Sequence, residues 1–324
     1  MRRAALFCSG RRLRGALLGG LALAPGCRSA PAIPVAAVDA SAPAATGTCA
    51  SLRDGAVARR SGFAAGPRVA IGVIADPREA RPETLASLRR VAELFRERQV
   101  DAVAALGGLG DDAEGIAKVV TALAAAHAPI FALPGDREPE EAFHEGLDRA
   151  RADGLDVIDL QRVRVIVGDG LTIAALPGYP HHSYLVDGTC RFVAADVIAL
   201  GELVDNLPKL ADHPTLLLAH TPPRGDGEGA IDWVAGANLG DPSVAALVAA
   251  GRFTAGAFAH FDEDGGRATD GVGFGAHPVA ERAWATRLFV NAGSIDALPR
   301  PGHPRAEAVV VEIEGGHARF WVLP

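Results

Sequence analysis

The sequence predicts an α/β domain built around a parallel β-sheet. Continuous apolar runs at 69–75, 102–106 and 129–133 each stop at a polar or glycine-rich turn, as buried strands do. The segments between them carry apolar residues at helical spacing. Strand–helix–strand units of this length form parallel sheets with right-handed crossovers. We therefore expect the three turns along the carboxyl edge of the sheet, where open α/β sheets bind ligands.

The remaining elements follow in chain order. Apolar spacing predicts the first two helices, with Leu85, Leu88, Ala92 and Phe95 on one face and then Ile116, Val119, Val120 and Leu123 on another. Gly154 ends a third helix that begins at Glu140. The later predicted strands are 157–158, 164–167, 171–176, 215–219, 254–259 and 288–291, with an edge hairpin at 308–313 and 318–323. The later predicted helices are 193–207 and 243–250, and the main loops are 177–191 and 224–242.

The amino terminus reads as a targeting segment. A basic region is followed by a short apolar stretch and then by Ala24-Pro25-Gly26-Cys27. This resembles a bacterial lipoprotein signal, so residues 1–27 are interpreted as a signal peptide with lipidation at Cys27. The expected location is extracytoplasmic and membrane-anchored. The alternative is an ordinary cleaved signal and a secreted or periplasmic protein.

Residues 28–66 are rich in alanine and proline and show little periodicity, which predicts a tether between membrane and domain. The domain itself is then expected over 67–324. Cys49 and Cys190 would either form a disulfide in an oxidising compartment or remain as two thiols.

The composition argues against nucleic-acid binding. The chain has 324 residues and a formal net charge of −7, and no basic stripe with interleaved aromatic residues occurs in the sequence. We therefore expect no nucleic-acid partner.

Polar side chains follow several predicted strands. Asp76, Asp136 and His220 each come directly after an apolar run, as do the turns 107–111 and 260–262. Carboxylates and imidazoles from separate strands, gathered at one sheet edge, are what a metal centre needs. Each alone is more often a turn or capping residue, so the joint pattern carries the interpretation.

At this point the chain resembles the calcineurin-like metallophosphoesterase family. The motifs that carry the resemblance are Asp76-Pro77-Arg78, Gly107-Gly108-Leu109-Gly110-Asp111, Gly135-Asp136-Arg137-Glu138, His220, Ala259-His260-Phe261-Asp262 and Asn291-Ala292-Gly293-Ser294. Their order, spacing and placement after strands agree with the family over about residues 67–323. The resemblance implies two packed mixed β-sheets flanked by helices, with a centre that holds two metal ions.

The motifs also depart from the family pattern. Gly108 stands where the family has the aspartate that bridges both metals. Arg78 and Asp262 stand where the family has histidine ligands of the first metal, and Asp76 alone is unchanged there. Asp76 and Asp262 are therefore also candidate metal ligands. Arg137 stands at the position of the family's catalytic histidine.

The second metal position keeps residues that can ligate, namely Asp136, His220 and His260. The resemblance therefore implies one divalent ion or none, of the Mn, Fe or Zn class.

Three interpretations follow. In the one we favour, phosphoester hydrolase activity is weak or lost, and Arg78 and Arg137 pair with carboxylates or bind a phosphate or other anion. In the second, Asp136, His220 and His260 hold the ion of a one-metal phosphoesterase, with the two arginines on the phosphoryl group. In the third, the chain is an extracytoplasmic binding or scaffold lipoprotein that uses loops 177–191 and 224–242.

Overall fold

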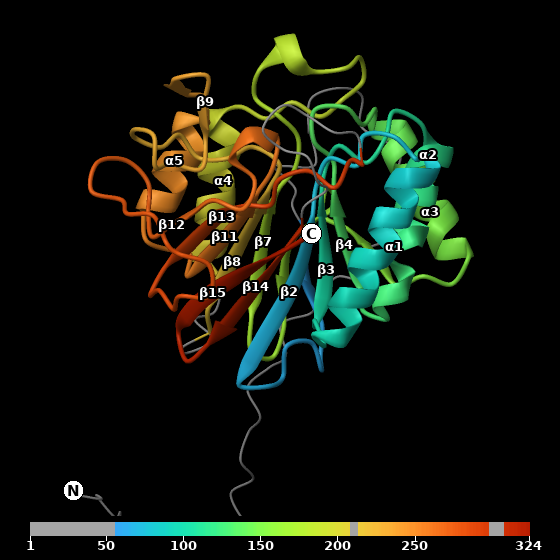
Figure 1. Cartoon of the computed structure of the whole chain (residues 1–324), viewed down its shortest axis with the longest axis horizontal. Coiled ribbons are helices and arrows are strands. Elements are labelled where there is room, and N and C mark those ends of the chain that lie inside the picture. The colour runs from blue at the N-terminus through green and yellow to red at the C-terminus, as the bar shows by residue number, and fades with distance from the viewer. Residues whose placement is uncertain (1–55, 208–212, 298–307) are drawn as a thin grey trace, which may run out of the picture. The chain divides into compact units, whose positions relative to one another are not determined.

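The computed structural model describes residues 56–207, 213–297 and 308–324, all within one compact unit. Two β-sheets face each other, and helices cover the outer face of each (Figure 1). This is the α/β architecture of two packed mixed sheets flanked by helices that was expected.

The first sheet has six strands. In sheet order they are β15 (His317–Leu323), β14 (Ala308–Glu314), β2 (Arg68–Ile74), β3 (Ala102–Leu106), β4 (Ile130–Leu133) and β5 (Val157–Asp159). Strands β2 to β5 are parallel, which confirms the predicted parallel core. Strand β14 pairs antiparallel with β2 and with β15, so the predicted carboxyl-terminal hairpin does form the edge.

The second sheet has seven strands. In sheet order they are β1 (Ala56–Arg59), β6 (Val163–Val167), β7 (Thr172–Leu176), β8 (Thr215–Ala219), β11 (Ala255–Phe258), β13 (Leu288–Asn291) and β12 (Ala268–Thr269). Strands β7, β8, β11 and β13 run parallel. A small hairpin of β9 (Trp233–Val234) and β10 (Ala237–Asn238) lies inside the segment predicted as a loop.

The helices flank the sheets in two groups. Those on the six-stranded sheet are α1 (Pro82–Glu97), α2 (Ala113–Ala122) and α3 (Glu140–Ala152); those on the seven-stranded sheet are α4 (Ala194–Asp205) and α5 (Pro242–Ala249). Short 3-10 turns are η2 (Leu123–Ala126), η3 (His182–Tyr184) and η4 (Asp262–Asp264). The Asp112 side chain caps α2 by accepting from Gly115 N, and Asp241 caps α5 in the same way.

The main core lies between the two sheets. Leu106 and Phe131 of the first sheet and Leu216 and Leu218 of the second are fully buried there. Such strands are buried on both faces, which is why they read as continuous apolar runs in the sequence.

The folded domain starts earlier than predicted. Strand β1 pairs in parallel with β6, and Phe63 and Ala64 are buried in the core between the sheets. The last residues of the predicted tether 28–66 therefore pack with the domain that was expected to begin at residue 67. The strand Ala56–Arg59 has a weak local signal, because alanines fill half of it and its pairing depends on a distant segment.

Other predictions fall on residues that are not described. The signal peptide 1–27, the lipidation site Cys27, Cys49 and most of the predicted tether lie outside the described residues. Within the described ranges, none of the helices has the length and apolar character needed to cross a bilayer.

Candidate metal centre

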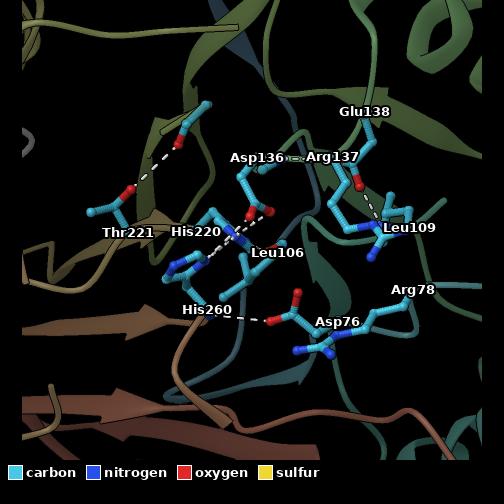
Figure 2. A network of polar contacts seen from close by, with 12 residues as sticks. Asp76, Arg78, Leu106, Leu109, Asp136, Arg137, Glu138, His220, Thr221 and His260 are labelled. Atoms are coloured by element: carbon cyan, nitrogen blue, oxygen red, sulfur yellow. Dashed lines mark hydrogen bonds and ion pairs between the residues drawn. The ribbon is translucent and has the colours of Figure 1, made fainter. Parts of the chain in front are cut away.

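Turns from both sheets meet at one place. The six-stranded sheet contributes Asp76 after β2, Gly108 after β3 and Asp136 after β4, while the seven-stranded sheet contributes His220 after β8 and His260 after β11. The sequence predicted this convergence at one sheet edge. The structure places it where the carboxyl ends of two facing sheets come together, because each sheet supplies part of the group (Figure 2).

Asp136, His220 and His260 form a compact group that could hold a metal ion. One ligand atom from each lies within 4.8 Å of the others. His220 Nε2 lies 3.2 Å from Asp136 Oδ1 and 3.2 Å from His260 Nδ1, and His260 Nδ1 lies 3.6 Å from Asp136 Oδ2. Figure 2 shows the three side chains pointing toward one another. One carboxylate and two imidazoles are a common ligand set for a divalent ion with open positions.

A hydrogen bond to the backbone fixes the orientation of the His220 ring. This ring is fully buried, and Nδ1 lies 2.7 Å from the carbonyl oxygen of Leu106, the last residue of β3. Because a carbonyl can only accept, Nδ1 is the donor. This leaves Nε2 directed at Asp136 and His260, as in metal-binding histidines held by a backbone carbonyl.

Asp136, His220 and His260 differ in how readily each carries a charge. Burial alone would lower the pKa of His220, but the carboxylates of Asp76 and Asp136 outweigh it and raise that pKa to about 10. Burial and the charge on His220 lower the pKa of His260 to about 3. Burial opposes ionisation of Asp136, yet hydrogen bonding and charge from His220 lower its pKa to about 2. An imidazolium–carboxylate pair therefore lies beside a neutral imidazole.

Asp76 and Arg78 lie next to this group. The Asp76 carboxylate is buried, and its Oδ2 accepts a hydrogen bond of 3.1 Å from the backbone N–H of His260. Burial raises the pKa of Asp76 above its ordinary value, against the charge of His220. Arg78 Nη2 donates to Asp262 Oδ2 at 2.6 Å. Two of the predicted ligand-position residues, Arg78 and Asp262, are thus bonded to each other.

Gly108 packs directly against Asp76. A Cβ atom at Gly108 would lie 2.2 Å from Asp76 Oδ1 and 2.7 Å from Asp76 Cα, and Gly108 has a φ of 66°. Its carbonyl oxygen also accepts from Arg78 N at 2.6 Å. The turns after β2 and β3 are therefore in contact where the family has a bridging carboxylate. The donors present suit an ion held by Asp136, His220 and His260, and Gly108 adds none for a neighbour.

The Arg137 guanidinium is turned toward the turn after β3. Its Nε and Nη2 donate to the two carboxylate oxygens of Asp111 at 3.0 and 2.9 Å. The charge of Asp136 adds to this pair in raising the pKa of Arg137. The Arg137 side chain is thus engaged outside the Asp136, His220 and His260 group.

Glu138 has a structural part that the sequence reasoning missed. The side chain is fully buried and accepts the backbone N–H groups of Leu109 and Gly135, which ties the turns after β3 and β4 together. Burial raises the pKa of Glu138 to about 7. The sequence placed Glu138 in the motif 135–138, but that motif does not indicate that its carboxylate is buried and accepts backbone N–H groups.

The turn 291–294 is hydrogen-bonded to the turns that carry Asp76 and His260. Buried Asn291 donates through Nδ2 to the carbonyls of Ile231 and Phe261, and its Oδ1 accepts from Gly293 N. Ser294 Oγ donates to the carbonyl oxygen of Asp76 at 2.9 Å. This motif, singled out in the sequence, thus holds the turns after β2 and β11.

The backbone is strained at three of these positions. Asp76, Arg78 and His260 have φ values of 49°, 59° and 73°. Residues other than glycine rarely adopt this left-handed backbone conformation, which costs on the order of 1 kcal/mol per residue. All three lie in turns that present polar groups to the site.

Two tyrosines that the sequence reasoning did not single out surround His260. The Tyr179 ring lies 4.2 Å from the His260 ring between centroids, and the Tyr184 ring lies 5.7 Å away at a steep angle. Both come from the loop 177–191, where their only signal was aromatic residues flanking His181 and His182. Those two histidines do not join the Asp136, His220 and His260 group, although His181 contacts Tyr184.

Cys190 is disulfide-bonded. It lies in the same loop 177–191 as Tyr179, and its carbonyl oxygen accepts a hydrogen bond of 3.1 Å from Tyr179 N. The other cysteines of the chain, Cys8, Cys27 and Cys49, lie outside the described residues.

Comparison with solved structures identifies the fold. A protein from Thermus thermophilus is similar over 78% of this chain and 98% of its own, with 16% identity and a TM-score of 0.51. A dimetal phosphatase from Danio rerio is similar over 78% and 98%, with 12% identity and a TM-score of 0.50. A putative 5′-nucleotidase from Staphylococcus aureus is similar over 79% of this chain and 54% of its own, with 14% identity and a TM-score of 0.51.

No protein-family model matches the sequence, and no curated protein matches it. The likeness to these structures is therefore one of fold, at identities far below those that would carry an activity across. The two facing mixed sheets flanked by helices agree with this likeness. The chain has the calcineurin-like fold of the metallophosphoesterases.

Proposed function

We propose that this protein binds one divalent ion of the Mn, Fe or Zn class through Asp136, His220 and His260, and that its phosphoester hydrolase activity is weak or lost. The observation that carries the proposal is the contrast between two neighbouring places. Three ligand atoms converge at the first, within 4.8 Å of one another. At the second, Gly108 touches Asp76 and Arg78 is bonded to Asp262.

Ligand count and charge support a single ion. Two-metal hydrolysis depends on a shared ligand that keeps the ions roughly 3.5–4 Å apart. Gly108 has no side chain for this, and the guanidinium of Arg78 adds positive charge where a second cation would sit. A bound ion would supply Lewis acidity toward a phosphoryl oxygen. Both arginines are paired with carboxylates, Arg78 with Asp262 and Arg137 with Asp111. Arg78 is the nearer cation, and it would bind a phosphate oxygen by sharing its guanidinium with Asp262.

Metal stoichiometry tests the proposal. The full chain is loaded with Mn²⁺ or Zn²⁺, dialysed, and its metal content measured per chain. We expect about one ion, lost in His260→Ala and kept in His277→Ala, because His277 is exposed on another loop. Two ions per chain, or one ion unaffected by His260→Ala, would contradict the assignment.

A one-metal phosphoesterase is the second candidate, favoured by the position of Arg78. Arg78 lies in the turn that carries Asp76 and donates to Asp262, two residues after His260, so its positive charge lies beside the place where a phosphoryl group would meet the ion. Hydrolysis of bis-p-nitrophenyl phosphate decides between the two. Turnover that disappears in both His260→Ala and Arg78→Ala supports the enzyme, and turnover at the level of buffer supports the inactive form.

We further propose that the protein is an extracytoplasmic lipoprotein anchored through Cys27, which rests on the sequence of residues 1–27 alone. Cys27→Ser should move the protein from the detergent phase to the aqueous phase. Unchanged partitioning of that variant would remove the anchor.

A further inference from the structure

A cavity opens beside the candidate metal centre. It has a volume of about 390 Å³, within the range of small-molecule sites. Its lining includes Tyr179, Thr221, Arg224, Leu239 and Asp241. These residues come from the loop 177–191 and from the glycine-rich segment 221–242.

The cavity and the metal centre share a wall. The Tyr179 ring packs on His260, and the same residue lines the cavity. Thr221 follows His220 directly in the chain, and its Oγ1 donates to the carbonyl oxygen of Gly178 at 3.4 Å. The cavity therefore lies directly next to the Asp136, His220 and His260 group.

The rim of the cavity is held in shape by a buried carboxylate. Asp232 has no exposed surface, and it accepts from Gly225 N at 3.0 Å, Asn238 Nδ2 at 2.9 Å and Gly240 N at 2.8 Å. Gly240 lies so close to Pro223 that a Cβ atom there would be 2.5 Å from the Pro223 carbonyl oxygen. The cavity is thus framed by fixed backbone, as preformed ligand sites are.

Arg224 gives the cavity a cation available to a ligand. Its backbone is fixed by a hydrogen bond of 3.0 Å from Arg224 N to the carbonyl oxygen of Asp241. Its side chain is exposed, and its guanidinium has no hydrogen bond or ion pair with any residue of the described ranges. The carboxylate oxygen of Asp241 caps α5 instead, by accepting from Ser243 N and Val244 N.

Leu239 supplies an apolar wall. Its side chain is 46% exposed although it lies at the cavity, which leaves apolar surface that a bound group would cover. Together with Tyr179 it provides contact for a ring or carbon skeleton, and Arg224 provides contact for an anion.

We propose that this cavity binds the organic group of a phosphoester that carries a second anionic group. The second anion pairs with Arg224, the carbon skeleton packs on Leu239, and the first phosphate faces the metal centre. The place of the first phosphate rests on the proposed function, whereas the contacts with Arg224 and Leu239 do not. The ligand class is therefore a phosphoester whose organic group carries a second anion, and a nucleoside bisphosphate is a suitable probe for it.

Binding measurements on the full chain test this, with adenosine 3′,5′-bisphosphate and adenosine 5′-monophosphate as probes. Titration calorimetry is done with and without Mn²⁺. We expect Arg224→Ala to weaken bisphosphate binding roughly tenfold or more and monophosphate binding less than about twofold, because a single charge-assisted contact is lost. Arg90→Ala is the matched control, since Arg90 is an exposed arginine of α1. Leu239→Asn should weaken both probes alike.

The outcomes separate this inference from the metal proposal. Binding that depends on Arg224 but is unchanged by Mn²⁺ and by His260→Ala supports the cavity and counts against the metal centre. Equal binding of the two probes, equal effects of Arg224→Ala and Arg90→Ala, or no bisphosphate binding by the unmodified chain would overturn the inference. Circular dichroism of each variant confirms that the fold is intact.

Discussion

The crowding around Gly108 determines whether a single substitution can introduce a bridging carboxylate at the candidate site. A side chain there meets the backbone and carboxylate of Asp76 and must adopt a left-handed φ of 66°. We predict that Gly108→Ala lowers the free energy of unfolding by about 2–4 kcal/mol, from strain and overpacking together. Chemical denaturation of the full chain measures this. Gly108→Asp should be destabilised at least as much and should gain no second ion.

Gly273→Ala is the control for the conformational part alone. Gly273 has a φ of 73° but no atom within 4 Å of where a Cβ would lie. It should cost about 1 kcal/mol. If both glycine variants cost the same, Gly108 is not crowded and the missing bridging carboxylate has no steric cause.

His144 offers a test of stability against pH away from the site. Its ring is buried in α3, with Nδ1 2.7 Å from Asp159 Oδ2 and Nε2 3.6 Å from Glu140 Oε1. Burial alone would lower the pKa of His144, but hydrogen bonds to these two carboxylates raise it from 6.5 to about 9. A raised folded-state pKa stabilises the fold fully below the unfolded pKa, and this stabilisation disappears as pH rises through the folded one.

We predict that the unmodified chain loses up to about 3 kcal/mol of stability from this group between pH 6.5 and pH 9. In His144→Gln that loss should be absent, since glutamine cannot carry the proton. Urea unfolding of both proteins at the two pH values provides the comparison. Parallel pH profiles would show that His144 is not protonated in the folded state.

At the scale of elements, strand β1 and the turn after it are more than an appendage of the predicted tether. Phe63 is 5% exposed and packs edge-to-face on Phe131 with ring centroids 5.3 Å apart. We predict that Phe63→Ala lowers the free energy of unfolding by about 3–4 kcal/mol, because it leaves a cavity between the sheets.

Phe274→Ala serves as its matched control. Phe274 is 99% exposed, so its removal should change stability by less than about 0.5 kcal/mol. Thermal unfolding followed by circular dichroism distinguishes the two. A Phe63 variant as stable as the Phe274 variant would return residues before 67 to the tether.

Helices and strands could be predicted from the sequence where a strand is buried on both faces or where apolar residues recur at helical spacing. Strands β2, β3 and β4 and helices α1 to α3 follow from apolar runs and helical spacing, and the site turns follow from where those runs stop. Strand β1 and the β9–β10 hairpin were missed because their pairing is decided by distant partners and not by their own residues. For the same reason the buried position of Glu138 and the packing of Tyr179 on His260 could not be predicted, because both depend on contacts between separate loops.

At the scale of the whole molecule, the Cys190 disulfide is a covalent restraint on the domain. We predict that Cys49 is the partner of Cys190, because the lipoprotein proposal places Cys27 at the lipid anchor and Cys8 in the removed signal peptide. Reduction, or Cys190→Ser, should lower stability by about 2–5 kcal/mol. Non-reducing peptide mapping identifies the partner, and Cys49→Ser should release one titratable thiol. A stability unaffected by reductant in the unmodified protein would contradict this.

The left-handed backbone at Asp76, Arg78 and His260 predicts which substitutions would accumulate if the protein were selected for folding alone. Glycine at any of the three would relieve strain, so a population screened only for resistance to heat or protease should accumulate glycine there. A screen that also demands ligand capture should reject those changes. Deep mutational scanning under the two regimes would show, residue by residue, whether these conformations are a relic of ancestry or a feature that present selection maintains.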